Sequence, residues 1–266
     1  MHLTIEHSTT YEFEDTPDYG LQQVRLKPKD SPSQRVENWE LSVTGGEFQA
    51  EFNDHYRNAV TLLSIDAHAE SITVRCQGFV ETTDTSGVLG KHRGLVPLWY
   101  FKQPTDLTRA GSELRGLTRG LRETAAEPIA CLHELSRRVA DTVVYQTGTT
   151  DIQTTAEDAV QRGHGVCQDH AHIFIGAARH LRFPARYVSG YLMATADQPQ
   201  YAGHAWAEIY VESLGWVGFD VSNRVSPDAR YVRVATGLDY RDAAPISGLR
   251  FGRGGEAMSV EICVQQ

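Results

Sequence analysis

The chain has 266 residues, which suits two domains better than one, and 41% of them are hydrophobic, enough for a globular core. No apolar run approaches the length of a membrane span, and the N-terminus lacks the basic head and apolar stretch of a signal peptide, so we expect no membrane association. The net charge is -9 with dispersed acidic residues, which argues against a nucleic-acid partner. The four cysteines are scattered and form no CxxC pair; this predicts neither a disulfide framework nor a metal ribbon, and it indicates a cytoplasmic setting.

The first hundred residues predict a β-rich domain. Four segments alternate polar and apolar side chains with the period of a β-strand. They are residues 3–7, 21–26, 39–43 and 71–76. Short strands separated by proline and glycine are typical of a small antiparallel sandwich. We therefore expect residues 1–100 to form an N-terminal β-sandwich-like domain.

Residues 101–150 are expected to form a helical bridge that belongs to the second domain. Glu127-Pro128 opens its clearest helix, because proline is favoured at the first helical position. The apolar stripe of that helix is Ile129, Leu132, Leu135, Val139 and Val143. A capping box at Thr154-Thr155-Ala156-Glu157 predicts a short helix that ends at Gly163. Residues 151–266 then make up the expected core domain.

A glycine turn, Gly163-His164-Gly165, leads to Cys167 at the start of a predicted helix. The inward stripe of this helix is Cys167, His170, Ala171, Phe174, Ala178 and Leu181. Helix N-termini carry a partial positive charge and unpaired N–H groups, which favour the reactive thiolate form of a cysteine. We interpret Cys167 as a candidate nucleophile; the alternative is a small buried core residue.

Two later stretches alternate like strands and predict a hairpin. His204 to Val211 is the first, and Trp216 to Val221 is the second. Folding them about a turn near residue 213 brings Asp220 within side-chain reach of His204. A histidine and a carboxylate on one face can act as a base and the group that orients it, with Cys167 as the nucleophile.

These three motifs resemble the transglutaminase-like family of papain-type thiol enzymes. The stretches that carry the resemblance are Gly165-Val166-Cys167-Gln168-Asp169, His204-Ala205-Trp206 and Gly215-Trp216-Val217-Gly218-Phe219-Asp220, in the order Cys, His, Asp. The likeness is greatest to the bacterial branch, in which an N-terminal β-rich domain precedes the catalytic core. Two positions depart from it: Val221-Ser222 follows Asp220 where that branch usually has Pro-Thr, and His170 stands where an aromatic residue is commoner.

The resemblance implies an α+β fold, a papain-like core in which the nucleophile helix packs on an antiparallel sheet, and a catalytic triad of Cys167, His204 and Asp220. Such a site forms a thioester acyl-enzyme. With water as the acceptor the result is amide hydrolysis, by a cysteine protease, isopeptidase or amidase. With an amine the result is transamidation. Hydrolysis of a peptide or glutamyl amide is our first prediction and transamidation the second, because no acidic cluster resembles the calcium loops of animal transglutaminases. A non-catalytic binding module with this fold is the third alternative. No cofactor is implied, and the sequence does not predict the oligomeric state.

Three further residues are predicted to contact the substrate. His170 lies one helical turn from Cys167, and Trp206 shares the strand face of His204. Tyr191 lies close to this hairpin in the sequence. We expect no metal site, because the spacing of His170 and His172 puts these two histidines on different helix faces.

The remaining expectations concern the surroundings of the thiol. The backbone N–H of Cys167 is a natural oxyanion donor, while Gln153, Gln161 and Tyr145 stay open as candidates for a second donor. A groove lined by aromatic residues should run from Cys167 to the first domain, which forms one wall, and should suit an extended peptide or glutamyl chain. Its expected aromatic residues are Trp206, Tyr210, Tyr191 and Tyr201. The turn at residues 54–58 resembles a turn of the family with Arg57 in place of glycine, and we expect a solvated hairpin loop there.

Overall fold

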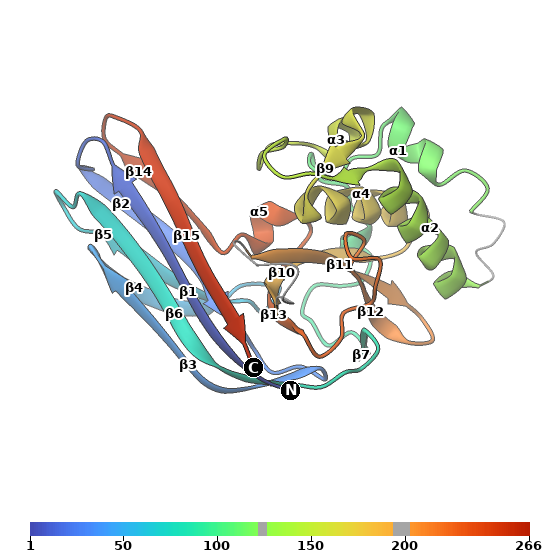
Figure 1. Cartoon of the computed structure of the whole chain (residues 1–266), viewed down its shortest axis with the longest axis horizontal. Helices are drawn as coiled ribbons and strands as arrows, with labels where there is room; N and C mark the ends of the chain where they lie inside the picture. Colours follow the sequence, from blue (N-terminus) through green and yellow to red (C-terminus); the bar gives the residue numbers. More distant parts are fainter. Residues whose placement is uncertain (122–126, 194–202) are drawn as a thin grey trace.

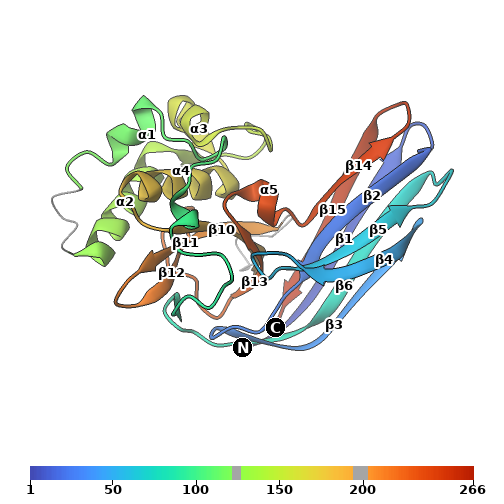
Figure 2. The same ribbon diagram turned by 180° about the vertical axis from the view of Figure 1, so that it is seen from behind.

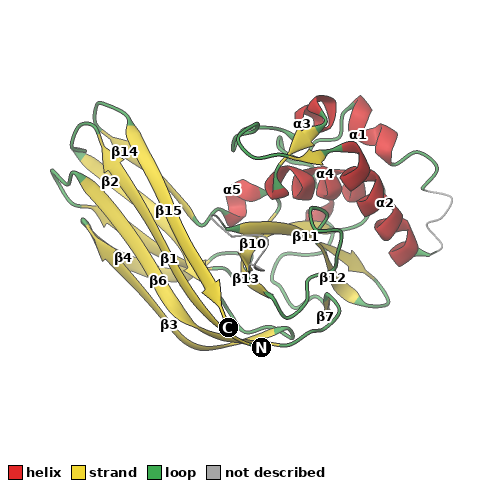
Figure 3. Ribbon diagram, viewed as in Figure 1, coloured by secondary structure: helices red, strands yellow, loops and turns green. Residues whose placement is uncertain are grey.

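The computed structural model describes residues 1–121, 127–193 and 203–266. It consists of a β-sandwich and a core of helices packed on an antiparallel sheet, which lie side by side (Figure 1). The helices gather on the core, and the sandwich consists of strands and loops (Figure 3). This arrangement confirms the predicted α+β fold class.

The sandwich has two four-stranded sheets, with strand orders β15-β1-β6-β3 and β14-β2-β5-β4. The strands are β1 (His2–Phe13), β2 (Tyr19–Lys27), β3 (Gln34–Thr44), β4 (Gly46–Asn53), β5 (Ala59–Ile65), β6 (Ser71–Thr82), β14 (Ile246–Phe251) and β15 (Glu256–Gln265). In β1 the side chains of Leu3, Ile5, His7 and Thr9 are all buried, while Glu6 on the opposite face is exposed. The period of two seen in the sequence therefore gives this strand one face that packs inward.

The expected domain boundary is wrong at the C-terminal end. Residues 151–266 were expected to belong to the core, but β14 pairs with β2 and β15 pairs with β1. The pairing of β15 with β1 runs from Thr4 opposite Gln265 to Phe13 opposite Glu256. The end of the chain thus completes both sheets of the sandwich, because each sheet accepts an antiparallel strand at its edge. Conversely, β7 (Val88–Gly90) lies within the expected first domain but joins the core sheet.

The core sheet has the strand order β13-β10-β11-β12-β7, and a short parallel pair, β8-β9, forms a separate two-stranded sheet that contacts helices α3 and α4. Its elements are β8 (Val144–Tyr145), β9 (His164–Gly165), β10 (Ala185–Leu192), β11 (His204–Val211), β12 (Gly215–Phe219) and β13 (Tyr231–Gly237). The helices are η1 (Tyr100–Lys102), α1 (Ser112–Leu117), α2 (Pro128–Thr142), α3 (Ala156–Arg162), α4 (Cys167–His180) and α5 (Tyr240–Ala243). Helix α4 packs on β11, whose Ala205, Ala207 and Ile209 join Phe174 and Ala178 in one buried cluster.

The two predicted helices before Cys167 are confirmed, but the capping box of the second one uses a different acidic residue from the one expected. Helix α2 begins at Pro128, as predicted. Helix α3 is capped by Thr155, whose side chain accepts from the N–H of Asp158, and it ends at Gly163 in the left-handed conformation. Glu157, the expected partner in this capping box, instead accepts hydrogen bonds from the N–H groups of residues 111, 113 and 114 at the start of α1. A carboxylate there satisfies N–H groups that the helix leaves unpaired.

The turn at residues 54–58 is not the solvated loop that we expected. Asn58 is buried, and its amide group makes two hydrogen bonds to the backbone of Thr236 in β13. Arg57 takes the left-handed conformation that glycine favours, with φ 67°. The turn therefore joins the sandwich to the core sheet, whose edge strand β13 faces the sandwich (Figure 2).

Candidate active site

The loop before Cys167 is fixed by the carboxylate of Asp169. This buried side chain accepts hydrogen bonds from the N–H of Val166 at 2.8 Å and from the hydroxyl of Thr150 at 2.7 Å. A Cβ at Gly165 would lie 2.7 Å from the Cβ of Asp169, so only glycine fits there without movement. These contacts place Cys167 as the first residue of α4, as predicted, where the helix has unpaired N–H groups.

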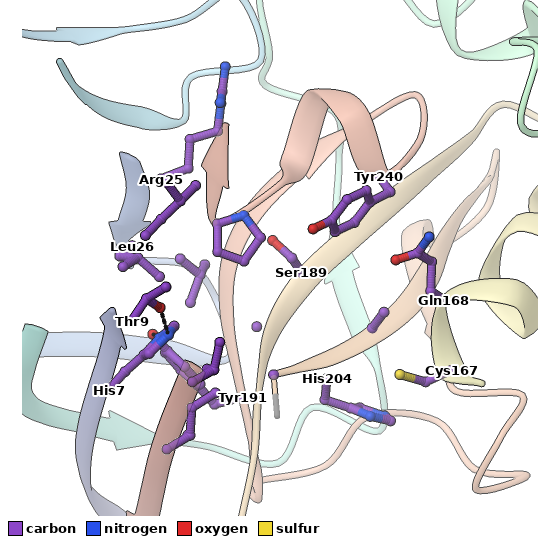
Figure 4. Close-up of a pocket in the computed structure, with 18 of the residues that line it drawn as sticks. His7, Thr9, Arg25, Leu26, Cys167, Gln168, Ser189, Tyr191, His204 and Tyr240 are labelled. Atoms are coloured by element: carbon purple, nitrogen blue, oxygen red, sulfur yellow. Dashed lines mark hydrogen bonds between the residues drawn. The ribbon is translucent and has the colours of Figure 1, made fainter. Parts of the chain in front are cut away.

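The predicted hairpin brings His204 and Asp220 into contact. Ala207 lies opposite Phe219 and Val211 opposite Gly215, so the hairpin turns about residue 213 as predicted. The Nε2–H of His204 donates to Oδ2 of Asp220 at 2.6 Å. The side chain of Cys167 points toward the His204 ring (Figure 4). The structure thus gathers all three triad candidates, while their catalytic roles stay a prediction.

The contacts of His204 favour its charged form. Burial alone would lower the pKa of His204, but the hydrogen bond to Asp220 and the nearby thiol of Cys167 outweigh it and raise this pKa to about 10. Burial likewise opposes ionisation of Asp220, yet its contacts with His204 and other donors hold its pKa below the ordinary value. The imidazolium is therefore paired with a carboxylate that stays ionised.

Two residues that hold Asp220 were not singled out in the sequence. The hydroxyl of Tyr231 donates to Asp220 Oδ2 at 2.7 Å, and the side-chain amide of Asn223 donates to the same oxygen at 2.6 Å. Asn223 could have been found, since it follows Asp220 by three residues, a spacing at which a side chain can hydrogen-bond back across a turn. Tyr231 comes from β13, and no local pattern links it to the hairpin.

His170 does not line the cleft, contrary to expectation. Its ring is buried, with Nδ1 2.8 Å from the hydroxyl of Ser222 and Nε2 2.9 Å from the carbonyl oxygen of Val143. Because a carbonyl only accepts, Nε2 is the donor and Nδ1 accepts from Ser222. His170 therefore links α4 to the end of α2 and to the loop after Asp220. Ser222 stands where the bacterial branch usually has threonine, and its hydroxyl makes the link to the loop.

Trp206 does not border the site either. The indole is buried beside His204, tilted 28° to its ring, and lies edge-on to Tyr231. Tyr210, four residues further along the strand on the same face, packs against Trp216. Only His204, at the end of β11, can reach Cys167, because the later residues of this face point away from α4. The predicted aromatic contribution of Trp206 and Tyr210 to the groove is therefore wrong.

A cavity of about 350 Å³ starts at Cys167 and His204 and continues between the core and the sandwich. Tyr191 lines it, as predicted, and Tyr201 lies outside the described residues. Of the three candidates for a second oxyanion donor, only Tyr145 lines the cavity, because β8 pairs with the loop that leads to Cys167. The expected wall from the first domain is present: β1, β2 and β15 all contribute lining residues.

The described ranges offer no metal centre and no membrane-spanning helix. No group of three or more His, Cys, Asp or Glu side chains in these ranges could hold a metal ion. His172, two residues after His170, is fully buried and accepts a hydrogen bond from the N–H of Tyr240. Among the described helices, none has the length and apolar character needed to cross a bilayer.

The fold and the Cys–His–Asp arrangement are those of the papain-like thiol class, and comparison with known families agrees. Residues 115–221 match the Transglutaminase-like superfamily, and residues 3–81 match the bacterial transglutaminase-like N-terminal region. The chain belongs to the transglutaminase-like superfamily, in agreement with the resemblance seen in the motifs. This membership supports a thiol-dependent enzyme in general terms.

Similar proteins cover nearly the whole chain. An uncharacterised protein of Mycobacterium leprae is 26% identical over 98% of this chain and 97% of its own length. An uncharacterised protein of Mycobacterium tuberculosis is 26% identical over 92% of this chain and 86% of its own length. The crystal structure of a candidate cysteine protease from Cytophaga hutchinsonii superposes with a TM-score of 0.76 at 24% identity, over 100% of this chain and 91% of that one. This structure shows that the sandwich and core occur together in a solved protein of the same fold.

Proposed function

We propose that the chain is a thiol-dependent amide hydrolase that works through a thioester on Cys167. The observation that carries the proposal is the line of contacts from Cys167 through His204 to Asp220 at the mouth of an interdomain cavity. With Nε2 held by Asp220, Nδ1 is the ring nitrogen left to exchange a proton with the thiol. The candidate cysteine protease of the same fold is consistent with this chemistry.

The reaction follows from these positions. The Cys167 thiolate attacks the amide carbonyl carbon, and the backbone N–H of Cys167 stabilises the oxyanion. The C–N bond then breaks, and the proton on His204 Nδ1 passes to the leaving amine. Water attacks the thioester after giving a proton to Nδ1, the C–S bond breaks, and the carboxylic acid is released. Asp220 keeps the ring oriented and stabilises its charge in both halves.

Membership in the transglutaminase-like superfamily supports a second reaction at the same site. A primary amine that replaces water in the second half attacks the same thioester and forms a new amide. The two reactions share their first half, so the acceptor alone distinguishes hydrolysis from transamidation.

The test is amine release from a panel of peptide amides and γ-glutamyl amides, with acyl adducts on the protein detected by mass spectrometry. Cys167→Ala should abolish release and the adduct while the circular dichroism spectrum stays unchanged. Cys263→Ala, which removes an exposed thiol on the sandwich, is the matched control and should keep both. Turnover by the Cys167→Ala protein would refute the assignment of Cys167 as the nucleophile. Adding a primary amine such as cadaverine shows whether transamidation competes with hydrolysis.

A further inference from the structure

The cavity that starts at Cys167 changes character along its length. Near the thiol it is lined by residues with hydrogen-bonding groups, among them Gln168, Thr147 and Tyr145. Further on it passes between the domains, where Leu26 of β2 and Val260 of β15 line it (Figure 4 shows Leu26 across the cavity from Cys167). One end is therefore suited to an amide group and the other to a hydrocarbon group.

Several polar side chains at the sandwich end are already paired with the protein itself. His7 lies 2.8 Å from the hydroxyl of Tyr191 and 2.9 Å from that of Thr9. The hydroxyl of Ser189 donates to the carbonyl oxygen of Ala243 at 2.6 Å. A polar group of a ligand that lay against these side chains would lose its water without gaining new partners, which is unfavourable.

The charges around this end also disfavour an ionised ligand. Burial lowers the pKa of His7 to about 4, so its ring is neutral at pH 7. None of the described lining residues is aspartate or glutamate. Apart from His204, which is at the thiol end and is paired with Asp220, the one cation among these lining residues is Arg25, whose guanidinium donates to Gln23 and Ser247 and is directed away from Cys167 (Figure 4). At the sandwich end, no positive charge is thus directed into the cavity to receive a carboxylate.

We propose that the sandwich end of the cavity binds an uncharged apolar group, aromatic or branched aliphatic, on the acyl side of the substrate. This inference rests on the proposed function, because it specifies the acyl donor of that reaction. The acyl side is the part that stays in place as the thioester while the amine leaves, so it is the part that an interdomain cavity can hold throughout. The preferred donors are then hydrophobic acyl groups, whereas the sequence had favoured a peptide or glutamyl chain.

The first experiment compares two activated esters that acylate the thiol, p-nitrophenyl 3-phenylpropionate and mono-p-nitrophenyl glutarate. The Cys167→Ala protein provides the rate that does not depend on the thiol. We expect kcat/KM of the wild type to be at least about ten-fold higher for the phenylpropionyl ester, since poorly filled pockets and uncompensated charges cost about this much or more. Equal values for the two esters, or a preference for the glutaryl ester, would overturn the proposal.

Variants of β15 then test whether the cavity causes the preference. Val260→Trp fills the sandwich end and should lower kcat/KM for the phenylpropionyl ester about ten-fold, and Val260→Lys should shift the preference toward the glutaryl ester. Ser259→Trp is the matched control, because Ser259 is exposed on the opposite face of the same strand and should leave both values unchanged. The rate of Cys167 alkylation by iodoacetamide should be the same in all of these proteins. A preference that survives Val260→Trp in a folded protein would overturn the proposal.

Binding to the Cys167→Ala protein separates this inference from the proposed function. Saturation-transfer NMR should detect 3-phenylpropanamide but not glutaramic acid, and Val260→Trp should remove the signal. If this pattern holds while the wild type turns over no ester or amide, the hydrolase proposal fails and the assignment of the cavity stands. If both compounds bind equally, or neither binds, the assignment of the cavity is wrong.

Discussion

Tyr231 and His204 donate hydrogen bonds to the same oxygen, Oδ2 of Asp220, at 2.7 and 2.6 Å. Tyr231 lies on β13 and His204 on β11, so the carboxylate of Asp220 is held from two strands at once. A carboxylate fixed in this way can orient the imidazole without turning away to another partner. Asp220 is therefore expected to control the orientation and protonation of His204 and not to contact the substrate.

Replacing Asp220 by asparagine should lower the pKa of His204 from its value of about 10. The change removes the negative charge that favours the imidazolium, and an effect of about one to three pKa units is typical for such a pair. NMR titration of the ¹⁵N-labelled ring would show this directly. Unchanged titration in Asp220→Asn would mean that the carboxylate does not control the base.

The same shift predicts how stability depends on pH. Because the pKa of His204 is raised above 6.5 in the folded protein, its contribution is fully present below about pH 6.5 and is lost as the pH rises through about 10. The free energy of unfolding of the wild type should therefore fall over this range, and that of Asp220→Asn should fall less. Urea denaturation at several pH values measures both slopes, and equal slopes contradict the expectation.

The three triad variants are expected to differ in how much they reduce kcat. His204→Ala should reduce kcat nearly as much as Cys167→Ala, by about 10⁴-fold or more, because the described site offers no second base beside the thiol. Asp220→Asn should cost less, since Asp220 orients the ring and does not react itself. Amide hydrolysis rates at fixed pH give the order. Wild-type activity in His204→Ala would refute the assignment of the base.

Tyr145 is the candidate whose position in the cavity suits the second oxyanion donor. It lies on β8, which pairs with the loop leading to Cys167, and both burial and the nearby Cys167 raise its pKa, so its hydroxyl keeps the proton that it would donate. Tyr145→Phe should lower kcat about 10²-fold with little change in KM, as for the loss of one oxyanion donor. Tyr19→Phe, at an exposed position of the sandwich, is the control. A change confined to KM would instead indicate a binding role.

Asn58 should contribute to stability although it lies far from the thiol in sequence. Asn58→Ala leaves the buried N–H and C=O of Thr236 without the side chain that satisfies them, which should cost about 1–3 kcal/mol of unfolding free energy. Asn53→Ala, at a nearby exposed position, should be neutral. Chemical denaturation of the two variants tests this, and equal midpoints would show that the turn does not hold the domains together.

Local patterns predicted the residues that approach each other through one helix or one hairpin. The glycine turn before Cys167 and the register that brings His204 to Asp220 are both short-range features, and the structure has them as expected. The errors concern contacts between distant segments. Trp206 shares a strand face with His204, yet the orientation of the sheet relative to α4, which that pattern does not contain, buries it away from the cavity. The buried bonds of His170 likewise depend on Ser222, which is 52 positions away.

The pairing of β15 with β1 gives the last prediction, which concerns a shortened chain that begins at residue 101. Such a chain lacks β1 and β2, the partners of β15 and β14, and it lacks β7 at the edge of the core sheet. It also exposes Val232 of β13, which is buried against Leu3 and Ile5 of β1. Unpaired edges and exposed apolar surface promote aggregation, so we expect this chain to be insoluble or to lack a cooperative unfolding transition. Circular dichroism and thermal melts compare it with the full chain. A soluble product with one cooperative transition and alkylation of Cys167 at the full-length rate would show that the core folds alone, and the sandwich would then be needed for the cavity but not for the fold.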